Sequence, residues 1–555
     1  APTSATGPGI ARESICDTAD MTPRQRWTLL ATVIGSGAVF LDGTIVNVAL
    51  PRIGRELPAS IVGVLEGQTY VVSGYLTVLA ALLILAGALS DRYGRRRVYG
   101  IGLAGFAITS GLCGLAPSLE ALVVFRLLQG AAGALMVPGA LSIITQTFDD
   151  AERGRAFGIW TAATSALALV GPVVGGLLVD SIGWRIAFLV NVPVLGVALL
   201  ITRRYMAESR DLDVRRGFDW LGSFVAAVAV GGLSFGVIRG GEREWRDPSA
   251  WLFLAIGAIA LVAFPALMAT RRDPLVPLGL FRSRVFSAIN IATFFIWGGL
   301  YVMFSYLSIV LQGPLGYSAL GAGAAVLPFA FCMITLSTRI GTIAGRMGAK
   351  RFLTLGPLLM ATGLLWFTRL PATSEPWRAS LDRLGSLVPP AGYLVDVLPA
   401  ILVFGTGIAC VVAPLTNTLM GSIPARYSGL GSAINNAIAR VGQPLLGAVI
   451  FVAISATFYS SLSAHAPDLD LTAETVRTAF PPLNVPRTGA TPDQVVAAAR
   501  ASVEAFHLAM LVAAGLVAIG AAVSWFGLPE GAASRRTSAT ALPTTDDATD
   551  EPVTA

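Results

Sequence analysis

The sequence predicts an all-α polytopic membrane protein with fourteen transmembrane helices. Only 13% of its 555 residues are charged, which is about half the share found in an ordinary soluble domain. The mean hydropathy is +0.70, and 54% of the residues are hydrophobic. Apolar segments of about 20 residues, the length that spans a lipid bilayer, recur along the whole chain. Together these observations exclude a soluble, fibrous or disordered protein.

The apolar segments fall into three groups that define the predicted domains. An N-terminal six-helix bundle occupies residues 23–204, an inserted two-helix segment 205–275, and a C-terminal six-helix bundle 276–527. The last bundle includes a long outer loop at 459–503, where Thr491, Pro492 and Gln494 indicate the start of a helix. The fourteen segments lie near 27–49, 67–89, 98–116, 119–141, 156–180, 186–203, 220–238, 249–269, 286–311, 319–340, 352–370, 393–415, 431–457 and 504–526.

The distribution of basic residues predicts the orientation of the chain. If the N-terminus is cytoplasmic, most of the Lys and Arg residues fall in cytoplasmic segments, as the positive-inside rule requires. An even number of spans then places both termini in the cytoplasm. The tail at 1–22 has no apolar stretch of the kind found in a signal peptide, and the tail at 528–555 has the composition of a disordered segment.

An internal repeat indicates that the two bundles are related halves. The string GALSDRYGRRR at 87–97 follows the second span, and GTIAGRMGAKR at 341–351 follows the tenth. Four aligned positions are identical in the two strings, and one of them is the pair of Gly94 and Gly348. Because repeated halves are a common construction of transporters, the repeat favours a transport protein. The seventh and eighth spans are then a pair inserted between the halves.

Asp42 and Arg126 are the charged residues expected deepest in the first half. Asp42 precedes Pro51 by nine residues, and Arg126 follows Pro117 by nine. At 1.5 Å per residue, both lie about 13 Å below the same membrane boundary and can face each other. A lone intramembrane acid indicates a functional site. We expect the pair to couple transport to protons, and the alternative is a purely structural salt bridge.

Four motifs, in order and on the expected spans, resemble the major facilitator superfamily and in particular its fourteen-helix drug:proton antiporter branch. The resemblance covers roughly residues 27–527. The motifs are LDGTIVNVALPRI at 41–53, GALSDRYGRRRV at 87–98, FRLLQGAAGALMVP at 125–138 and GPVVGGLLVD at 171–180. The last motif departs from the family pattern at Leu167, where a glycine is usual.

The resemblance implies that the motif at 87–98 is a conformational latch between the halves. Asp91 would contact the N-terminus of the thirteenth span, near Ser428 and Gly429, because an anion is stabilised at a helix N-terminus. The arginines of the motif pair with acids or anionic lipids, or they only fix the topology. The residues predicted for the latch are Gly87, Asp91, Arg92, Gly94, Arg95 and Arg96.

The motif at 171–180 is predicted to form a close helix contact that closes the outer side. Gly171 and Gly175 share one helix face, and small residues let a neighbouring helix approach closely. The resemblance implies that the neighbour is the tenth span, with Pro172 and Gly176 completing the contact. Ordinary small-residue packing is the alternative.

Arg440 is a second deep cation, in the thirteenth span, and no deep acid is evident in its half. We expect a structural or gating role for it. The sequence contains neither a nucleotide-binding loop nor a pattern of metal ligands or catalytic nucleophiles, so no cofactor and no enzymatic activity are predicted.

The predicted function is proton-coupled export of amphipathic organic compounds or drugs across the cytoplasmic membrane. The alternatives are a dedicated exporter of one secondary metabolite, peptide or lipid, and a membrane sensor that transports nothing. The expected partners are protons, membrane lipids and a small substrate, with no nucleic acid; the sequence does not predict the oligomeric state. Since Asp42 is the only deep acid placed in the first half, neutral or monocationic substrates are expected to be favoured over dications.

Overall fold

The computed structural model describes residues 21–209, 219–243, 245–272, 274–423, 428–487 and 489–529. Within these ranges the regular elements are helices, and one isolated β-bridge joins Ser380 and Arg383. The all-α prediction is therefore confirmed. The predicted tails, apart from residues 21–22 and 528–529, lie outside the described residues.

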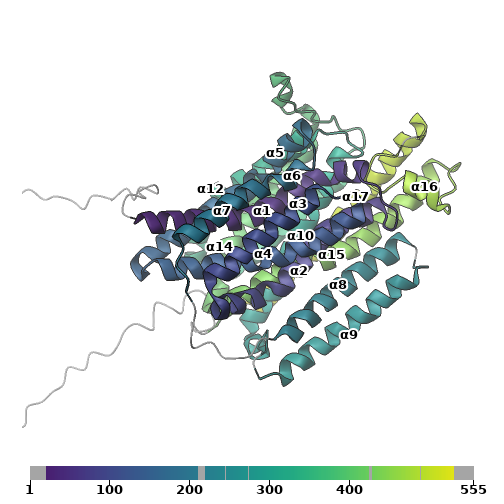
Figure 1. Cartoon of the computed structure of the whole chain (residues 1–555). Coiled ribbons are helices and arrows are strands. Elements are labelled where there is room, and N and C mark those ends of the chain that lie inside the picture. The colour runs from purple at the N-terminus through teal and green to yellow at the C-terminus, as the bar shows by residue number, and fades with distance from the viewer. Residues whose placement is uncertain are drawn as a thin grey trace, which may run out of the picture.

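The first half of the chain forms a bundle of long helices (Figure 1). Its sixth span is divided at Val190 into a short and a longer helix. The most extensive helix contacts in this half are between α2 and α4, α1 and α5, and α3 and α4. The helices are α1 (Pro23–Glu56), α2 (Val64–Tyr93), α3 (Arg95–Gly114), α4 (Leu119–Thr147), α5 (Asp150–Ser181), α6 (Ile186–Leu189) and α7 (Asn191–Tyr205).

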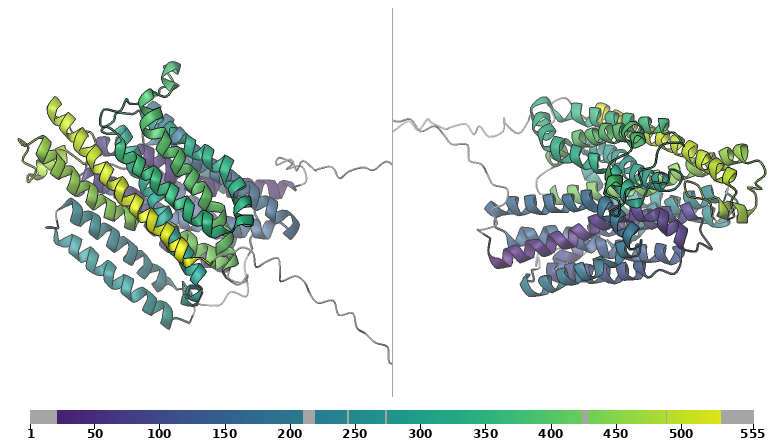
Figure 2. Two further views of the ribbon diagram at one scale, coloured as in Figure 1. Left: turned by 180° about the vertical axis from the view of Figure 1, so that it is seen from behind. Right: turned by 90° about the horizontal axis from the view of Figure 1, so that it is seen from above.

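The second half forms a corresponding bundle beside the first, as Figure 2 shows from above. Its tenth span is divided at Val326, one residue before a helix that carries Pro at its start. The helices are α10 (Arg284–Gln312), α11 (Ala319–Ala325), α12 (Leu327–Met347), α13 (Ala349–Trp366), α14 (Leu398–Gly421), α15 (Ser428–His465), α16 (Glu474–Ala479) and α17 (Pro492–Gly527). Short helical turns lie at Leu278–Arg282, Phe367–Arg369, Leu384–Leu387 and Tyr393–Val397.

The inserted pair, α8 (Trp220–Glu242) and α9 (Pro248–Thr270), lies along one edge of the two bundles (Figure 1). Helix α8 packs on α2 and on α15, and α9 packs mainly on α8. An ion pair of 3.3 Å between Arg239 and the fully buried Glu66 joins α8 to α2. Asp247 caps α9 by accepting from the backbone of Ser249, and its hydrogen bonds to Ser249 lower the pKa of this carboxyl.

Twelve helical segments in the described part of the chain are long and apolar enough to cross a membrane. Helices α2 and α3, of 30 and 20 residues, are not among these twelve, yet both pack inside the first bundle against α4. The count of fourteen spans therefore stays a prediction. The end of the molecule where α1 begins is called the Pro23 end below, and the end where α1 finishes is called the Glu56 end.

Two local predictions have clear structural counterparts. The repeated glycines Gly94 and Gly348 both have positive φ, +106° and +93°, and each ends one helix and starts the next. Only glycine adopts such a backbone without strain. Thr491 is the N-cap of α17, and Gln494 completes the capping box, as the sequence predicts. The long loop is shorter than predicted, because α15 continues to His465 and α17 begins at Pro492.

The contact between α8 and α9 depends on small residues. A Cβ added at Gly232 would lie 2.8 Å from the Cα of Gly257, closer than real contacts allow. We predict that Gly232→Ala destabilises the protein by about 1–3 kcal/mol, the usual cost of overpacking. Gly196→Ala on α7, where a Cβ would meet nothing within 4 Å, is the control and should gain slightly from its higher helix propensity. Thermal unfolding of the purified protein measures both, and equal stability of the two variants would contradict the prediction.

Candidate functional site

A fully buried ion pair lies in the middle of the first bundle. The Nη1 atom of Arg126, on α4, lies 2.5 Å from Oδ2 of Asp42, on α1. The two side chains are 1% and 0% exposed. The depth comparison made from the sequence thus placed these residues at one level, and the structure brings them into contact. A charge buried in this way is tolerated only when it is paired and hydrogen-bonded.

A polar network extends from the pair to three further helices. Gln129 accepts from Arg126 Nη1 at 2.7 Å and donates to Asp42 Oδ1 at 3.2 Å. Its amide also donates to Ser110 on α3, which accepts in turn from Asn191 on α7. The Nε atom of Arg126 donates to the carbonyl of Val71 on α2 at 3.1 Å. Neither Ser110 nor Asn191 was singled out from the sequence, because a serine and an asparagine in separate spans give no spacing signal.

Aromatic rings complete the surroundings of Arg126. Its guanidinium carbon lies 4.1 Å from the centre of the Tyr75 ring and 5.7 Å from that of Phe188. Cation–π contacts of this kind contribute up to about 2 kcal/mol when they are desolvated. Arg126 therefore keeps favourable contacts that do not depend on the charge of Asp42.

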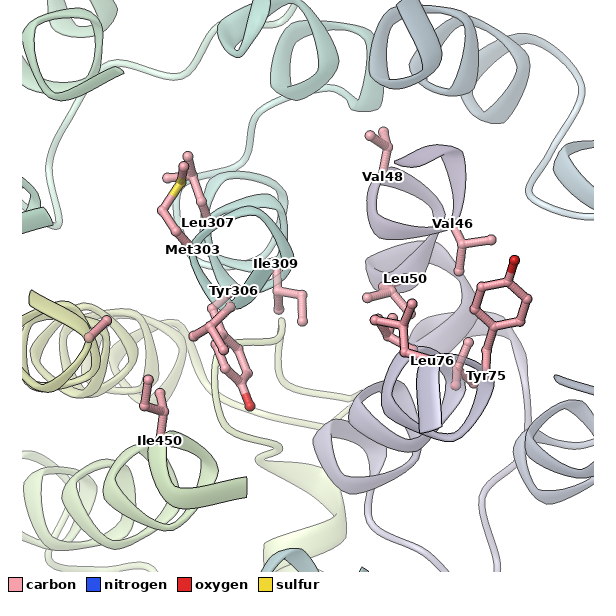
Figure 3. Packing of buried hydrophobic residues seen from close by; sticks show 14 of the residues in the cluster. Val46, Val48, Leu50, Tyr75, Leu76, Met303, Tyr306, Leu307, Ile309 and Ile450 are labelled. Carbon is pink, nitrogen blue, oxygen red and sulfur yellow. The ribbon is translucent and has the colours of Figure 1, made fainter. Parts of the chain in front are cut away.

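A cavity of about 210 Å³ lies between the two bundles, beside the ion pair. Arg126 contributes to its wall, whereas Asp42 does not. Figure 3 shows apolar side chains nearby, on α1 and α2 from one half and on α10 from the other. Polar contacts bridge the halves at the wall, where Ser305 donates to Asn47 at 3.1 Å. Such a mainly apolar cavity with a few polar groups is typical of a site for an organic ligand.

Arg440, on α15, lies in the same cavity wall and is 9% exposed. Its guanidinium carbon lies 5.7 Å from the centre of the Phe40 ring on α1. Among the residues that the structure describes, no hydrogen bond or ion pair involves Arg440. The second deep cation of the sequence is therefore a cavity residue.

The two bundles are joined at the Glu56 end. Gln68, on α2, exchanges two hydrogen bonds of 3.0 Å with Asn484, in the loop before α17, and both side chains are buried. Gln312 of α10 donates to the carbonyl of Val48 at 3.0 Å. Together with the bond between Ser305 and Asn47, these hydrogen bonds lie at the level of Asn47 and toward this end. The structure thus shows the halves closed at the Glu56 end.

Asp180 contributes to this closure from the last position of the motif at 171–180. Its carboxylate accepts from the backbone N–H groups of Ala319, at 3.2 Å, and Leu320, at 2.7 Å. These groups begin α11, where free N–H groups favour an anion. A contact of this kind is predicted from the sequence for Asp91, whereas Asp180 was not singled out.

The small residues of the same motif face two different helices. A Cβ at Gly171 would collide with Thr44, and one at Gly175 would lie 3.1 Å from the Cα of Ile45, so both glycines face α1. A Cβ at Gly176 would collide with the carbonyl oxygen of Ala319 on α11. The expectation that Gly171 and Gly175 contact the tenth span is wrong, because the face of α5 that carries them packs against α1. A different face of α5, which carries Gly176, meets the tenth span.

Pro172 belongs to the face that meets the tenth span. A Cβ at Gly323 of α11 would collide with the carbonyl oxygen of Pro172. Gly176 and Pro172 of α5 therefore form the close contact with α11. The sequence predicted such a contact for all four residues of the motif.

The motif at 87–98 forms the turn between α2 and α3 at the Pro23 end. Arg96 donates to the carbonyl of Met206 at 3.2 Å and lies 3.8 Å from Glu208, so it binds the segment after α7. Arg92 stacks on the neighbouring Tyr93 ring at 5.6 Å. The backbone N–H of Arg95 donates to the carbonyl of Ser209 at 3.0 Å.

Gly87 of this motif is not in a close helix contact. A Cβ there would lie 3.8 Å from Pro138, an ordinary contact. The side chains of Asp91 and Ser428 lie outside the described residues, so the predicted latch stays a prediction.

The comparison with known proteins assigns the family. Residues 32–447 match the Major Facilitator Superfamily, so the chain belongs to this superfamily of membrane transporters. It is a multi-pass protein of the cell membrane and not an enzyme. Of the solved structures, an inward-facing bacterial homologue of the human lysosomal transporter Spinster has a TM-score of 0.59 at 16% identity, covering 91% of this chain and 97% of that one. At this identity the likeness concerns the fold alone.

Several relatives are much more similar in sequence. The chain is 34% identical to the multidrug resistance protein Stp of Mycobacterium tuberculosis, over 81% of this chain and 80% of that protein. It is also 34% identical to the tetracenomycin C resistance and export protein of Streptomyces glaucescens, over 77% and 75%, and to the puromycin resistance protein of Streptomyces alboniger, over 76% and 80%. The sequence-based resemblance to drug-exporting members of the superfamily is confirmed.

The contact between α5 and α11 should be sensitive to side-chain size at Gly176. Gly176→Ala should separate these helices and weaken the closed Glu56 end by about 1–3 kcal/mol, since the new methyl group meets backbone and not a movable side chain. The test uses a protein that lacks its four native cysteines and carries Val48→Cys as a probe in the cavity. A membrane-impermeant maleimide is added outside intact cells. Gly176→Ala should increase the labelling of this probe.

Gly158→Ala on the same helix is the matched control, because a Cβ there meets nothing within 4 Å. It should leave the labelling unchanged. Equal labelling of the Gly176→Ala and Gly158→Ala proteins would show that the α5–α11 contact does not control access.

Proposed function

We propose that the protein is a proton-coupled antiporter that exports amphipathic organic compounds, including drugs, across the cytoplasmic membrane. The observation that carries the proposal is the buried Asp42–Arg126 pair beside the cavity between the halves. The resistance and export functions named for the relatives support drug efflux.

The proposed topology has fourteen spans with both termini in the cytoplasm, so that the Pro23 end faces inward. The positions of α2 and α3 inside the first bundle support the two spans beyond the twelve. The proposed division is an N-terminal bundle at 23–204, an inserted pair at 205–275 and a C-terminal bundle at 276–527. The dual packing of α8 on α2 and α15 supports an insertion that accompanies both halves.

Proton coupling follows from the chemistry of the pair. The ionised Asp42 accepts hydrogen bonds from Arg126 and Gln129, and so ties α1 to α4. A proton on Asp42 neutralises the carboxylate and removes the charge that Arg126 balances. Arg126 and Gln129 then change partners, which alters how α1 packs against α4. Because α1 also contacts α10 and α11 of the other half, this change reaches the interface that opens and closes.

The two ends of the interface hold alternate states. Asp180, Gly176 and Asn484 stabilise closure at the Glu56 end, as in the present structure. We propose that Asp91 does so at the Pro23 end, with Gly94 shaping the turn and with Arg92, Arg95 and Arg96 anchoring it. The side-by-side packing of α2 and α15 supports this placement.

A dedicated exporter of one compound is the second candidate. The relatives include proteins named for multidrug resistance and proteins named for one antibiotic. Reconstituted protein offered a panel of unrelated compounds distinguishes the two, since only a broad exporter moves several of them.

We predict that Asp42→Asn abolishes transport driven by a pH gradient while expression changes little. Asparagine keeps the shape and the acceptor oxygen of the side chain but cannot release a proton. Arg126 retains its contacts with Val71, Gln129 and Tyr75, and these offset part of the cost of leaving its charge unpaired. The measurement is dye efflux and internal pH in proteoliposomes with an imposed pH gradient.

Glu120→Gln, at an exposed turn of α4, is the control for removal of a carboxylate and should transport normally. pH-driven efflux by Asp42→Asn at the wild-type rate would exclude Asp42 as the coupling residue. Failure of the wild-type protein to move any compound against its gradient would refute the proposed function itself.

A further inference from the structure

The charge of the cavity wall has one sign. Among the described residues that line the cavity, the two that carry a charge are Arg126 and Arg440. The acid of the ion pair is absent from the wall, and its side chain is 0% exposed. A cationic ligand would therefore meet positive charge in the cavity, and no carboxylate would compensate it.

The two arginines differ in how they are balanced. Arg126 is paired with Asp42 and shared with Gln129 and the Val71 carbonyl. Arg440 is about nine-tenths buried, and in the described part of the chain its recorded partner is the ring of Phe40. A guanidinium stays charged at any physiological pH and has five N–H donors. Because Arg440 lines the cavity, an anionic group of a ligand can accept from these donors and balance the charge.

The remainder of the wall suits a planar apolar body. Five aromatic rings line the cavity, from both bundles, and the rings of Phe304 and Phe329 contact edge to face at 5.0 Å. Small polar side chains are interspersed among them. The aromatic residues of the wall are Phe40, Tyr75, Tyr301, Phe304 and Phe329.

We propose that the cavity binds aromatic organic acids and that the anionic group of the ligand pairs with Arg440. The proposal rests on the proposed function, for which it names the substrate class. It replaces the expectation of monocationic substrates, which assumed that Asp42 faces the cavity. The expected disadvantage of dications remains, and for a stronger reason, since the wall itself is positive.

Equilibrium binding tests the proposal without transport. The probe is an anthraquinone that carries a carboxylate, a carboxamide or a protonated aminomethyl group at the same ring position. Calorimetric titration of the full-length purified protein should show the carboxylate binding about tenfold more tightly than the carboxamide, and the ammonium compound binding most weakly.

Variants assign the preference to one residue. Arg440→Gln should bring carboxylate and carboxamide to equal affinity, and Arg440→Lys should restore most of the difference, because it restores the charge. Arg500→Gln, at an exposed position of α17 outside the cavity wall, should bind like the wild type. A thermal unfolding scan of each protein, together with the Lys variant, shows whether a loss of carboxylate affinity in Arg440→Gln reflects the lost charge or misfolding.

The outcomes separate the inference from the proposed function. Equal or tighter binding of the carboxamide or the ammonium compound by the wild type overturns the inference, as does an acid preference that survives Arg440→Gln. If the wild type exports the carboxamide in response to a pH gradient and ignores the acid, the function stands and the inference is wrong. If the acid binds through Arg440 but no compound is moved by a pH gradient, the inference stands and proton coupling is wrong.

Discussion

The buried ion pair of Asp42 and Arg126 is the constraint on which the first bundle depends. Two charges in a low-dielectric interior are strongly unfavourable unless each has a partner. The pair therefore requires Gln129 to serve both charges and Ser110 to orient Gln129. Helices α1, α2, α3, α4 and α7 are held in one arrangement by these bonds. A change in the charge of Asp42 would therefore alter contacts of all five helices, which supports the proposed coupling role of the pair.

The interface between the halves follows a different rule. It is made from small residues and a few separate hydrogen-bonded contacts, which bring the halves close together. Gly176 and Gly323 allow backbone to approach backbone between α5 and α11, and Asp180 adds a charge-assisted contact to the start of α11. Each contribution is small, so the closed state can be exchanged for another. The loop before α17 takes part through Asn484, so the long connection of the second half is also a component of the closure.

Much of the fold and part of the site could be predicted from the sequence. Span positions follow from hydropathy, and the pairing of Asp42 with Arg126 follows from counting residues from Pro51 and Pro117, because helices have a fixed rise. Helix facing could not be obtained in this way. A rotation of about 100° per residue decides whether Gly175 or Gly176 meets α11, and the motif alone does not specify it. The contact of Asn484 depends on Gln68, a partner far away in the sequence.

The sign of the cavity has a consequence for coupling. When proton and substrate are both cations, they compete electrostatically for one carboxylate, and exchange follows directly. With an anionic substrate the electrostatics reverse, since a proton on Asp42 leaves Arg126 unbalanced and makes the cavity more attractive to the anion. Linkage is reciprocal, so the bound anion would also favour the proton. Exchange of proton for an acid therefore cannot arise from competition for charge. The proposed exchange requires that protonated Asp42 favour one arrangement of the halves and that the occupied cavity favour the other. The contacts of α1 with α10 and α11 are the part of the structure through which such coupling would act.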